Sequence, residues 1–153
     1  MTSHATHHGG YGRFGAVLAI DFVVMYLVMF AMIATFRDFY LNLNTLYMTL
    51  MMVAPMAIVM VASMKAMYPS RALNQAIVGL SLLVFAGSWF AIRDQAAIGD
   101  KAFIRSMIPH HSGAVLMCRE APLADQELAS LCQRIIRSQQ EEIDQMRTIL
   151  ARL

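Results

Sequence analysis

Residues 16–36 have the sequence AVLAIDFVVMYLVMFAMIATF, which contains one charged side chain, Asp21. At 1.5 Å per residue, a helix of this length spans roughly 30 Å, the thickness of the hydrocarbon core of a bilayer. The apolar core of a signal peptide has only about 7 to 15 residues and precedes a small-residue cleavage site, whereas Arg37 follows this run. We therefore expect a retained transmembrane helix.

Two more apolar runs follow, at 46–67 and 76–92. Hydrophobic residues make up 58% of the chain and charged residues 14%, against about 25% charged in ordinary soluble domains. The sequence predicts an all-α membrane protein. We expect a disordered, His-containing N-terminus at 1–13 and three transmembrane helices within 14–92.

Lys and Arg residues in the short flanks of the spans indicate how the chain is oriented. Arg13, Lys65 and Arg71 lie on one side, and Arg37 and Arg93 lie on the other. This excess favours a cytoplasmic N-terminus. We therefore predict a multi-pass protein of the bacterial inner membrane whose C-terminal domain lies in the periplasm.

The totals of charged residues and cysteines narrow the classes of partner. Twelve basic residues are offset by ten acidic residues, for a net charge of +2. A protein that neutralises several phosphates needs a dense Lys/Arg face, so we exclude nucleic acid and expect the lipid bilayer as a partner. Two cysteines are too few for a disulfide-based scaffold.

Methionine is unusually frequent, with 14 residues, although it is normally a sparing gap-filler. Five methionines recur at every fourth position of the second span: Met48, Met52, Met56, Met60 and Met64. Such a stripe either relays Cu(I) or packs against lipid and neighbouring helices. Asp21 is costly inside a span, by about 2.5 to 3.5 kcal/mol on insertion scales, and we expect a structural ion pair with Lys65.

The charged C-terminal region, 99–153, has the pattern of an antiparallel helical hairpin. Gly99-Asp100 can cap a first helix that starts at Lys101, and Asp125 can cap a second helix after a break that contains Pro122. Heptad-like steps of four and three define a predicted seam, made of Phe103, Met107, His110, Ala114, Met117 and Ala121, then Leu128, Cys132, Ile135, Gln139, Glu142, Met146, Ile149 and Leu153. A core this small supplies little stability by itself. We expect a homodimer or higher oligomer that completes a four-helix bundle, or packing against the spans.

Residues 103–117 have the sequence FIRSMIPHHSGAVLM, which places thioethers and imidazoles together. Met107 lies three and four residues before His110 and His111, and Met117 lies two turns beyond His110, so all approach one side of a helix. Thioether and imidazole suit Cu(I) or Ag(I). The alternative is that the methionines are core residues and the histidines are hydrogen-bonded neighbours.

The second helix adds three residues to this seam: Gln139, Glu142 and Met146. Counting back from the turn places position 110 level with about 135 in an antiparallel pair. Gln139 and Glu142 would then approach the histidines, as ligands or as acceptors that orient an imidazole. Met146 would lie level with about residue 99, apart from Met117. Glu142 is alternatively a carboxylate exposed at the membrane interface.

Cys118 and Cys132 lie near the predicted turn. In an oxidising compartment they could form a disulfide that closes a 15-residue loop, worth about 3 kcal/mol. Cys118 could instead supply a thiolate to copper, since it lies seven residues after His111. A third alternative is two buried thiols with no special role.

The N-terminal residues include His4, His7 and His8. If Met1 is removed, the segment 2–4 would offer an amine, two amides and an imidazole in a square plane, a geometry that suits Cu(II) or Ni(II). Detection of Met1 in the intact mass would exclude this hypothesis.

The hairpin resembles the bacterial ferritin-like proteins catalogued as domain of unknown function 305 (DUF305). The resemblance rests on 103–114 with its Met-Ile-Pro-His-His core, on 116–117 and on 135–146, and it covers roughly 99–152. It implies a helical, mostly periplasmic domain, with some members linked to copper or silver binding and metal tolerance. The three-span region resembles the membrane-anchored subgroup. Carried over residue by residue, the family motif marks Met107, His110, His111, Met117, Gln139, Glu142 and Met146.

We predict a membrane-anchored protein that binds Cu(I) or Ag(I) and sequesters it or hands it to a metal-handling partner protein, without catalysis. A di-iron oxidase is excluded because no glutamate has a histidine three residues on. The competing hypothesis is a membrane assembly module whose hairpin docks a partner, with polar seam residues setting the register. A third is metal transport by an oligomer of the spans, lined by Asp21 and the methionine stripe.

Overall fold

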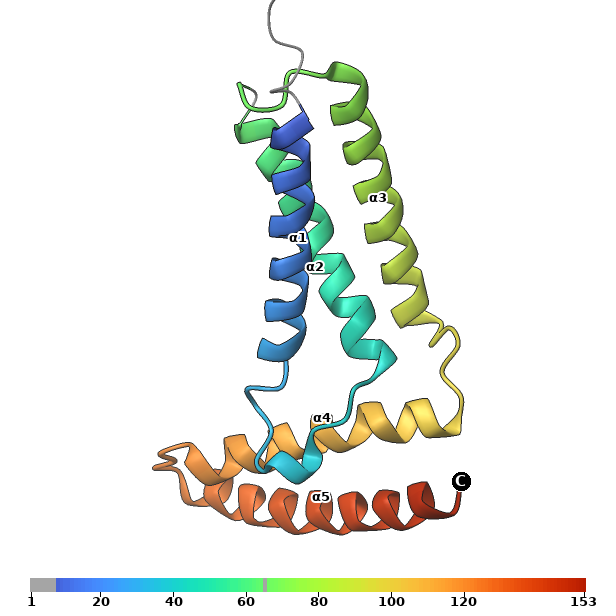
Figure 1. Cartoon of the computed structure of the whole chain (residues 1–153). Coiled ribbons are helices and arrows are strands. Elements are labelled where there is room, and N and C mark those ends of the chain that lie inside the picture. The colour runs from blue at the N-terminus through green and yellow to red at the C-terminus, as the bar shows by residue number, and fades with distance from the viewer. Residues whose placement is uncertain (1–7, 65) are drawn as a thin grey trace, which may run out of the picture. The chain divides into compact units, whose positions relative to one another are not determined.

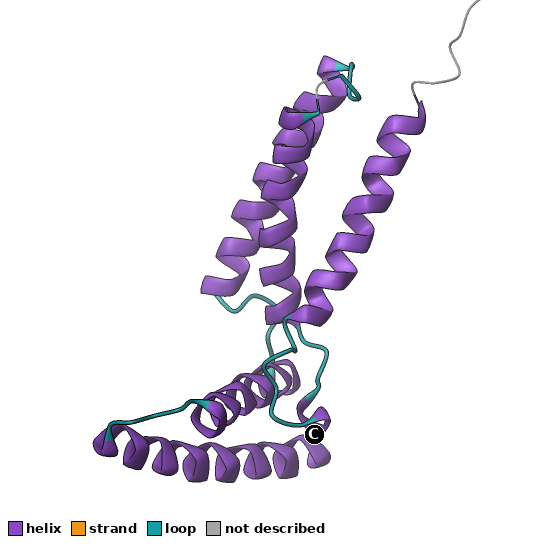
Figure 2. Ribbon diagram, turned by 90° about the vertical axis from the view of Figure 1, so that its left-hand side faces the viewer, coloured by secondary structure: helices purple, strands orange, loops and turns teal. Residues whose placement is uncertain are grey.

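The computed structural model describes residues 8–64 and 66–153, and this part of the chain contains five α-helices, a short 3-10 helix and no strand (Figures 1 and 2). The predicted all-α fold is confirmed. The helices form two compact units. Unit 1 combines the chain up to Leu27 with Leu46–Ala96, and unit 2 combines Val28–Thr45 with Ala97–Leu153.

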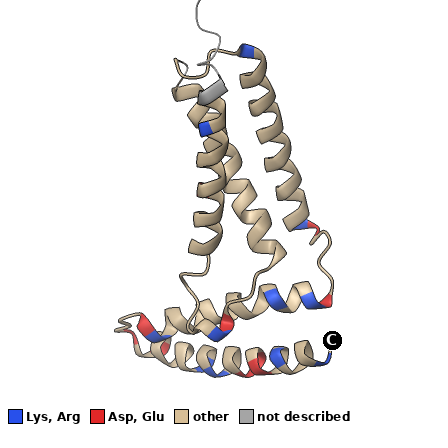
Figure 3. Cartoon of the chain, in the orientation of Figure 1, with Lys and Arg blue, Asp and Glu red and all other residues tan. Residues whose placement is uncertain are grey.

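Unit 1 is built on three long apolar helices: α1 (His8–Val28), α2 (Leu43–Ser63) and α3 (Arg71–Arg93). Each is long and apolar enough to cross a membrane, as predicted. Figure 3 shows that charged residues are sparse along them and frequent in unit 2. The second and third spans lie close to their predicted positions, and each begins earlier than predicted.

Helix α1 differs from the predicted first span at both ends. It begins at His8, inside the stretch that we predicted to be disordered. The rings of Tyr11 and Phe14 pack against Tyr68, and this contact holds the first turns of the helix. The helix ends at Val28, short of the predicted end, because the following residues fold into unit 2.

Polar bonds tie the N-terminal end of α1 to the start of α3. The Tyr11 hydroxyl donates to Asn74 Oδ1 at 2.9 Å and accepts from the Ser70 amide at 3.2 Å. Ser70 also caps α3, because its hydroxyl accepts from the Leu73 amide. A small apolar core beside these bonds contains four buried residues: Phe14, Ala57, Val61 and Tyr68.

The methionine stripe of α2 does not share one environment. Met60 packs against the core of unit 1, whereas Met48, Met52 and Met64 are exposed. Asp21 is half-buried in α1. Its predicted partner, Lys65, lies outside the described residues, as do residues 1–7 of the His-rich N-terminus.

Unit 2 contains the predicted hairpin, formed by α4 (Asp100–Glu120) and α5 (Gln126–Arg152), which lie side by side and antiparallel (Figure 1). The predicted cap of α5 is confirmed, because the Asp125 carboxylate accepts from the Leu128 amide at 2.7 Å. Helix α4 begins at Asp100, one residue before its predicted start, with Gly99 as its N-cap residue. Unit 2 also contains the segment Val28–Thr45, here called the interspan segment, which includes the 3-10 helix η1 (Phe36–Asp38).

The buried face of α4 lies one position away from the predicted seam. Ile104, Ile108, His111 and Val115 are buried, while Phe103, His110 and Met117 are exposed. The heptad pattern was therefore out of phase on this helix. Branched apolar side chains decide the rotation, because Ile104 and Ile108 pack against Ile143 of α5 in one cluster.

A disulfide joins Cys118 of α4 to Cys132 of α5. The structure thus selects the first of the three predicted alternatives for the cysteines. The bond also corrects the predicted register. A count symmetric about the turn would place residue 118 opposite 127, so at the disulfide the partner on α5 lies five residues, or roughly one and a half turns, further along than predicted.

Candidate functional site

His111 is the predicted ligand with the most defined surroundings. Its side chain is 10% exposed. The ring Nδ1 lies 2.9 Å from the Met107 carbonyl oxygen, one turn earlier on α4. A carbonyl oxygen only accepts, so Nδ1 carries a proton and donates it. This bond determines the orientation of the ring and leaves Nε2 as the atom available to another partner.

Nε2 of His111 meets Glu142 of α5. The distance to Oε2 is 2.7 Å, and the other carboxylate oxygen accepts from the Ser138 hydroxyl at 3.1 Å. The predicted approach of Glu142 to a histidine is confirmed. The pair lies at a half-open site, since the Glu142 side chain is 49% exposed.

Two more predicted ligands lie beside this pair on α4. His110 is exposed, and its ring centroid is 6.0 Å from that of His111. Met107 is half-buried, and its carbonyl oxygen is the acceptor for His111. The imidazoles thus differ, since one is buried and bonded at both nitrogens while its neighbour is open to solvent.

The other three predicted ligands differ in their surroundings. Met146 packs against the cluster of isoleucines, nearer to Ile104 than to the residue 99 level that the symmetric count predicted. Met117 is 53% exposed, two turns after His110. Gln139 is half-buried on α5. Among the residues that the structure describes, no three His, Cys, Asp or Glu side chains are grouped so as to hold a metal.

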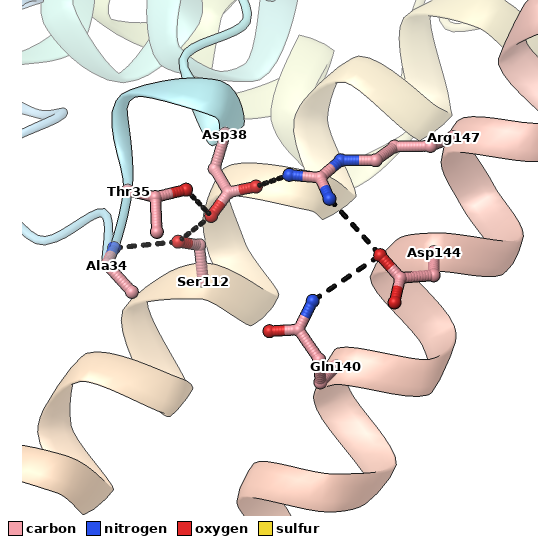
Figure 4. Close-up of polar contacts among 7 residues, drawn as sticks. All are labelled: Ala34, Thr35, Asp38, Ser112, Gln140, Asp144 and Arg147. Atoms are coloured by element: carbon pink, nitrogen blue, oxygen red, sulfur yellow. Dashed lines mark hydrogen bonds and ion pairs between the residues drawn. The ribbon is translucent and has the colours of Figure 1, made fainter.

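The sequence analysis missed the polar cluster around Asp38 (Figure 4). This carboxylate is 4% exposed. One oxygen accepts from the hydroxyls of Ser112 at 2.5 Å and Thr35 at 3.1 Å, and the other accepts from Arg147 Nη2 at 2.6 Å. Arg147 also donates to Asp144, its neighbour on α5, at 3.1 Å. A carboxylate at the end of an apolar run is therefore paired inside the C-terminal unit.

Other contacts place the interspan segment against the same part of α4. The Ala34 amide donates to Ser112 Oγ at 2.7 Å. The backbone of Met32 packs near Gly113, at a distance where a β-carbon would make an ordinary van der Waals contact. Ser106 Oγ lies 3.4 Å from Asn42 Oδ1. The Ser-Gly pair after the two histidines is the one local signal that another backbone packs at this point.

Comparisons with known proteins agree with the resemblance seen in the hairpin. The family model of a domain of unknown function, DUF305, matches residues 90–150. The chain is also 36% identical over 115 residues to the uncharacterized protein L153 of Acanthamoeba polyphaga mimivirus, across 74% of each chain. This match is longer than residues 90–150, so it extends into the preceding apolar helices. No solved structure matches the chain.

Proposed function

This chain belongs to the DUF305 family, and we propose that it binds Cu(I) or Ag(I) at the His111–Glu142 pair of its hairpin. The protein would hold the metal at a membrane or pass it to a partner protein, without catalysing a reaction. The family resemblance supports this proposal, since some members are linked to copper or silver. The geometry of His111 supports it independently.

The single observation that carries the proposal is the bond from His111 Nδ1 to the Met107 carbonyl. Histidine ligands of metals donate their second ring N–H to a carbonyl or carboxylate, which orients the ring and raises the basicity of the ligating nitrogen. In this chain the nitrogen so prepared, Nε2, faces the Glu142 carboxylate at 2.7 Å. A cation bound at Nε2 would have this carboxylate beside it to neutralise its charge.

The neighbouring donors fit a soft monovalent cation better than a hard one. His110 offers a second imidazole, and Met107 offers a thioether one turn earlier on α4. Imidazole and thioether suit Cu(I) and Ag(I), whereas Mg and Ca require several oxygen ligands. Glu142 would neutralise the charge of the cation, and Gln139 on α5 would support the site as a polar neighbour.

The disulfide supports a location for the hairpin in an oxidising compartment. In a bacterial cell, that compartment is the periplasm, which agrees with the orientation predicted from the Lys and Arg residues. The disulfide also removes both thiolates from the set of copper ligands.

The test is a Cu(I) titration of the full chain in detergent micelles against a competing chelator. His4, His7 and His8 are first replaced by alanine, so that the N-terminal tract contributes nothing. We expect one equivalent of tight binding in this background. His111→Ala should weaken it by more than about 100-fold, beyond the effect typical of outer-shell partners.

Glu142 provides a matched pair of variants. Glu142→Gln should weaken binding by about 10- to 100-fold, as expected for an outer-shell partner, and Glu141→Gln, the same charge change at an exposed neighbour, should leave it unchanged. Circular dichroism would establish that each variant stays helical. Equal affinity of the background and His111→Ala would overturn the proposal.

Exposed apolar side chains at the turn end of the hairpin favour a second candidate function, association with another copy of the chain. They are Met117, Leu128 and Leu131, each between 41% and 53% exposed. Such side chains are enriched at interfaces when they form one patch. Cross-linking at these positions, independent of metal, would support an assembly module, and a monomer under all conditions would exclude it.

A further inference from the structure

The interspan segment is connected to both helices of the hairpin through one side chain. Asp38 accepts from Ser112 of α4 and from Arg147 of α5 (Figure 4). Ser112 directly follows His111, and Arg147 lies five residues after Glu142. The buried carboxylate therefore joins α4 to α5 next to the point where His111 meets Glu142.

The disulfide is a second connection between the two helices. It starts at Cys118, seven residues after His111, and therefore holds the end of the hairpin near the turn. On α5, Cys132 and Arg147 lie on either side of Glu142, and on α4 Ser112 lies directly beside His111. A contact adjacent to a site determines the spacing across it better than a connection at a distance alone.

We propose that Asp38 is a positioning residue for the His111–Glu142 site, and that metal binding there orders the interspan segment in return. The inference rests on the proposed function, because it concerns the same site. It adds a role for residues that lie outside the matched domain, at the junction of the first two apolar helices.

The return effect follows from linkage. If the Asp38 contacts raise the affinity of the site for a cation, a bound cation must strengthen those contacts by the same factor. The interspan segment should respond to a bound cation, because Ala34 and Asp38 are both bonded to Ser112, the residue beside His111. A cation bound to the hairpin would thus strengthen the contacts of the residues that connect α1 to α2.

The first experiment repeats the Cu(I) titration on the full chain with Asp38→Asn. Asparagine retains the size of the side chain and an oxygen for the hydroxyls, and it loses the charge that pairs with Arg147. Asp144→Asn is the matched control, because Asp144 pairs with the same arginine but belongs to α5 and is 62% exposed. We expect at least about a fivefold loss of affinity in Asp38→Asn, the lower end of typical coupling, and no loss in the control.

The second experiment measures amide hydrogen exchange of residues 29–42 with and without Cu(I). Exchange of the Ala34 amide should slow on metal addition in the parent chain, and this protection should disappear in Asp38→Asn and persist in Asp144→Asn. A residue that only stabilises the fold would change exchange equally with and without metal.

The outcomes separate this inference from the proposed function. If the parent chain binds no Cu(I), the proposed function fails first. If the parent binds tightly while Asp38→Asn binds equally and exchange is unaffected by metal, the positioning role is overturned and the site stands. If Asp38→Asn loses helicity, Thr35→Val replaces it, since that change removes one bond from the same carboxylate and keeps the acceptor of the Ala34 amide; unchanged affinity and exchange in a folded Thr35→Val chain would overturn the inference.

Discussion

Units 1 and 2 bury their side chains in different ways. The three long helices of unit 1 bury between 6% and 22% of their apolar windows inside the structure. Unit 2, although smaller in apolar content, contains the isoleucine cluster, a disulfide and an ion pair whose carboxylate is buried. The contrast indicates that unit 2 is held together by its own side chains, whereas the unit 1 helices leave most of their apolar surface open, which is compatible with helices that face lipid.

The largest expected difference between the units concerns truncation of an aliphatic side chain. Ile108→Ala should destabilise unit 2 by about 2 to 5 kcal/mol, because Ile108 is fully buried and its loss leaves a cavity. Leu83→Ala in α3 should leave unit 1 unchanged in micelles, since Leu83 is 72% exposed. Denaturant-dependent hydrogen exchange, resolved by peptide, would measure both. Equal effects would remove the distinction between the units.

The disulfide offers a second way to test the comparison. Replacing Cys118 and Cys132 by serine should lower the free energy of unfolding of unit 2 by about 3 kcal/mol, the value for a loop of this length. Unit 1 should be unaffected. The same measurement in the parent chain after treatment with a reducing dithiol should match the variant. A reduced parent as stable as the oxidised one would show that packing alone holds the hairpin.

The smallest expected effect concerns the polar contacts of unit 1. Tyr11→Phe removes the hydroxyl that bonds with Asn74 and Ser70, at a cost of about 0.5 to 1.5 kcal/mol. Faster exchange in the first turns of α1 would confirm that these bonds hold the helix end. Unchanged exchange there would mean that the packing of Phe14 against Tyr68 is sufficient.

Local signals in the sequence were sufficient to predict the helices and one contact at the candidate site. Asp125 marked the start of α5, because a cap is encoded within three residues of the helix that it begins. Glu142 was expected near the histidines from the antiparallel pairing alone, and it meets His111. The match to DUF305 was likewise visible in the Met-Ile-Pro-His-His segment.

The features that the sequence did not predict depend on distant partners. The rotation of α4, which buries His111 and exposes His110, is decided by packing against Ile143 and by the interspan segment. The end of α1 at Val28 depends on that segment as well, since an apolar run by itself contains no signal to stop there. The partners of Asp38 could not be predicted from the sequence, because they lie 74 and 109 positions away along the chain.

The separation between Asp38 and Arg147 has a consequence for biosynthesis. At about 5 to 20 residues per second, a ribosome needs roughly 5 to 20 seconds to synthesise the chain between them. During that interval α2 and α3 are synthesised, while the carboxylate of Asp38 still lacks its arginine partner. The C-terminal unit therefore completes its set of contacts only when nearly the whole chain has been made, because its first segment and its last helix lie at opposite ends of the sequence.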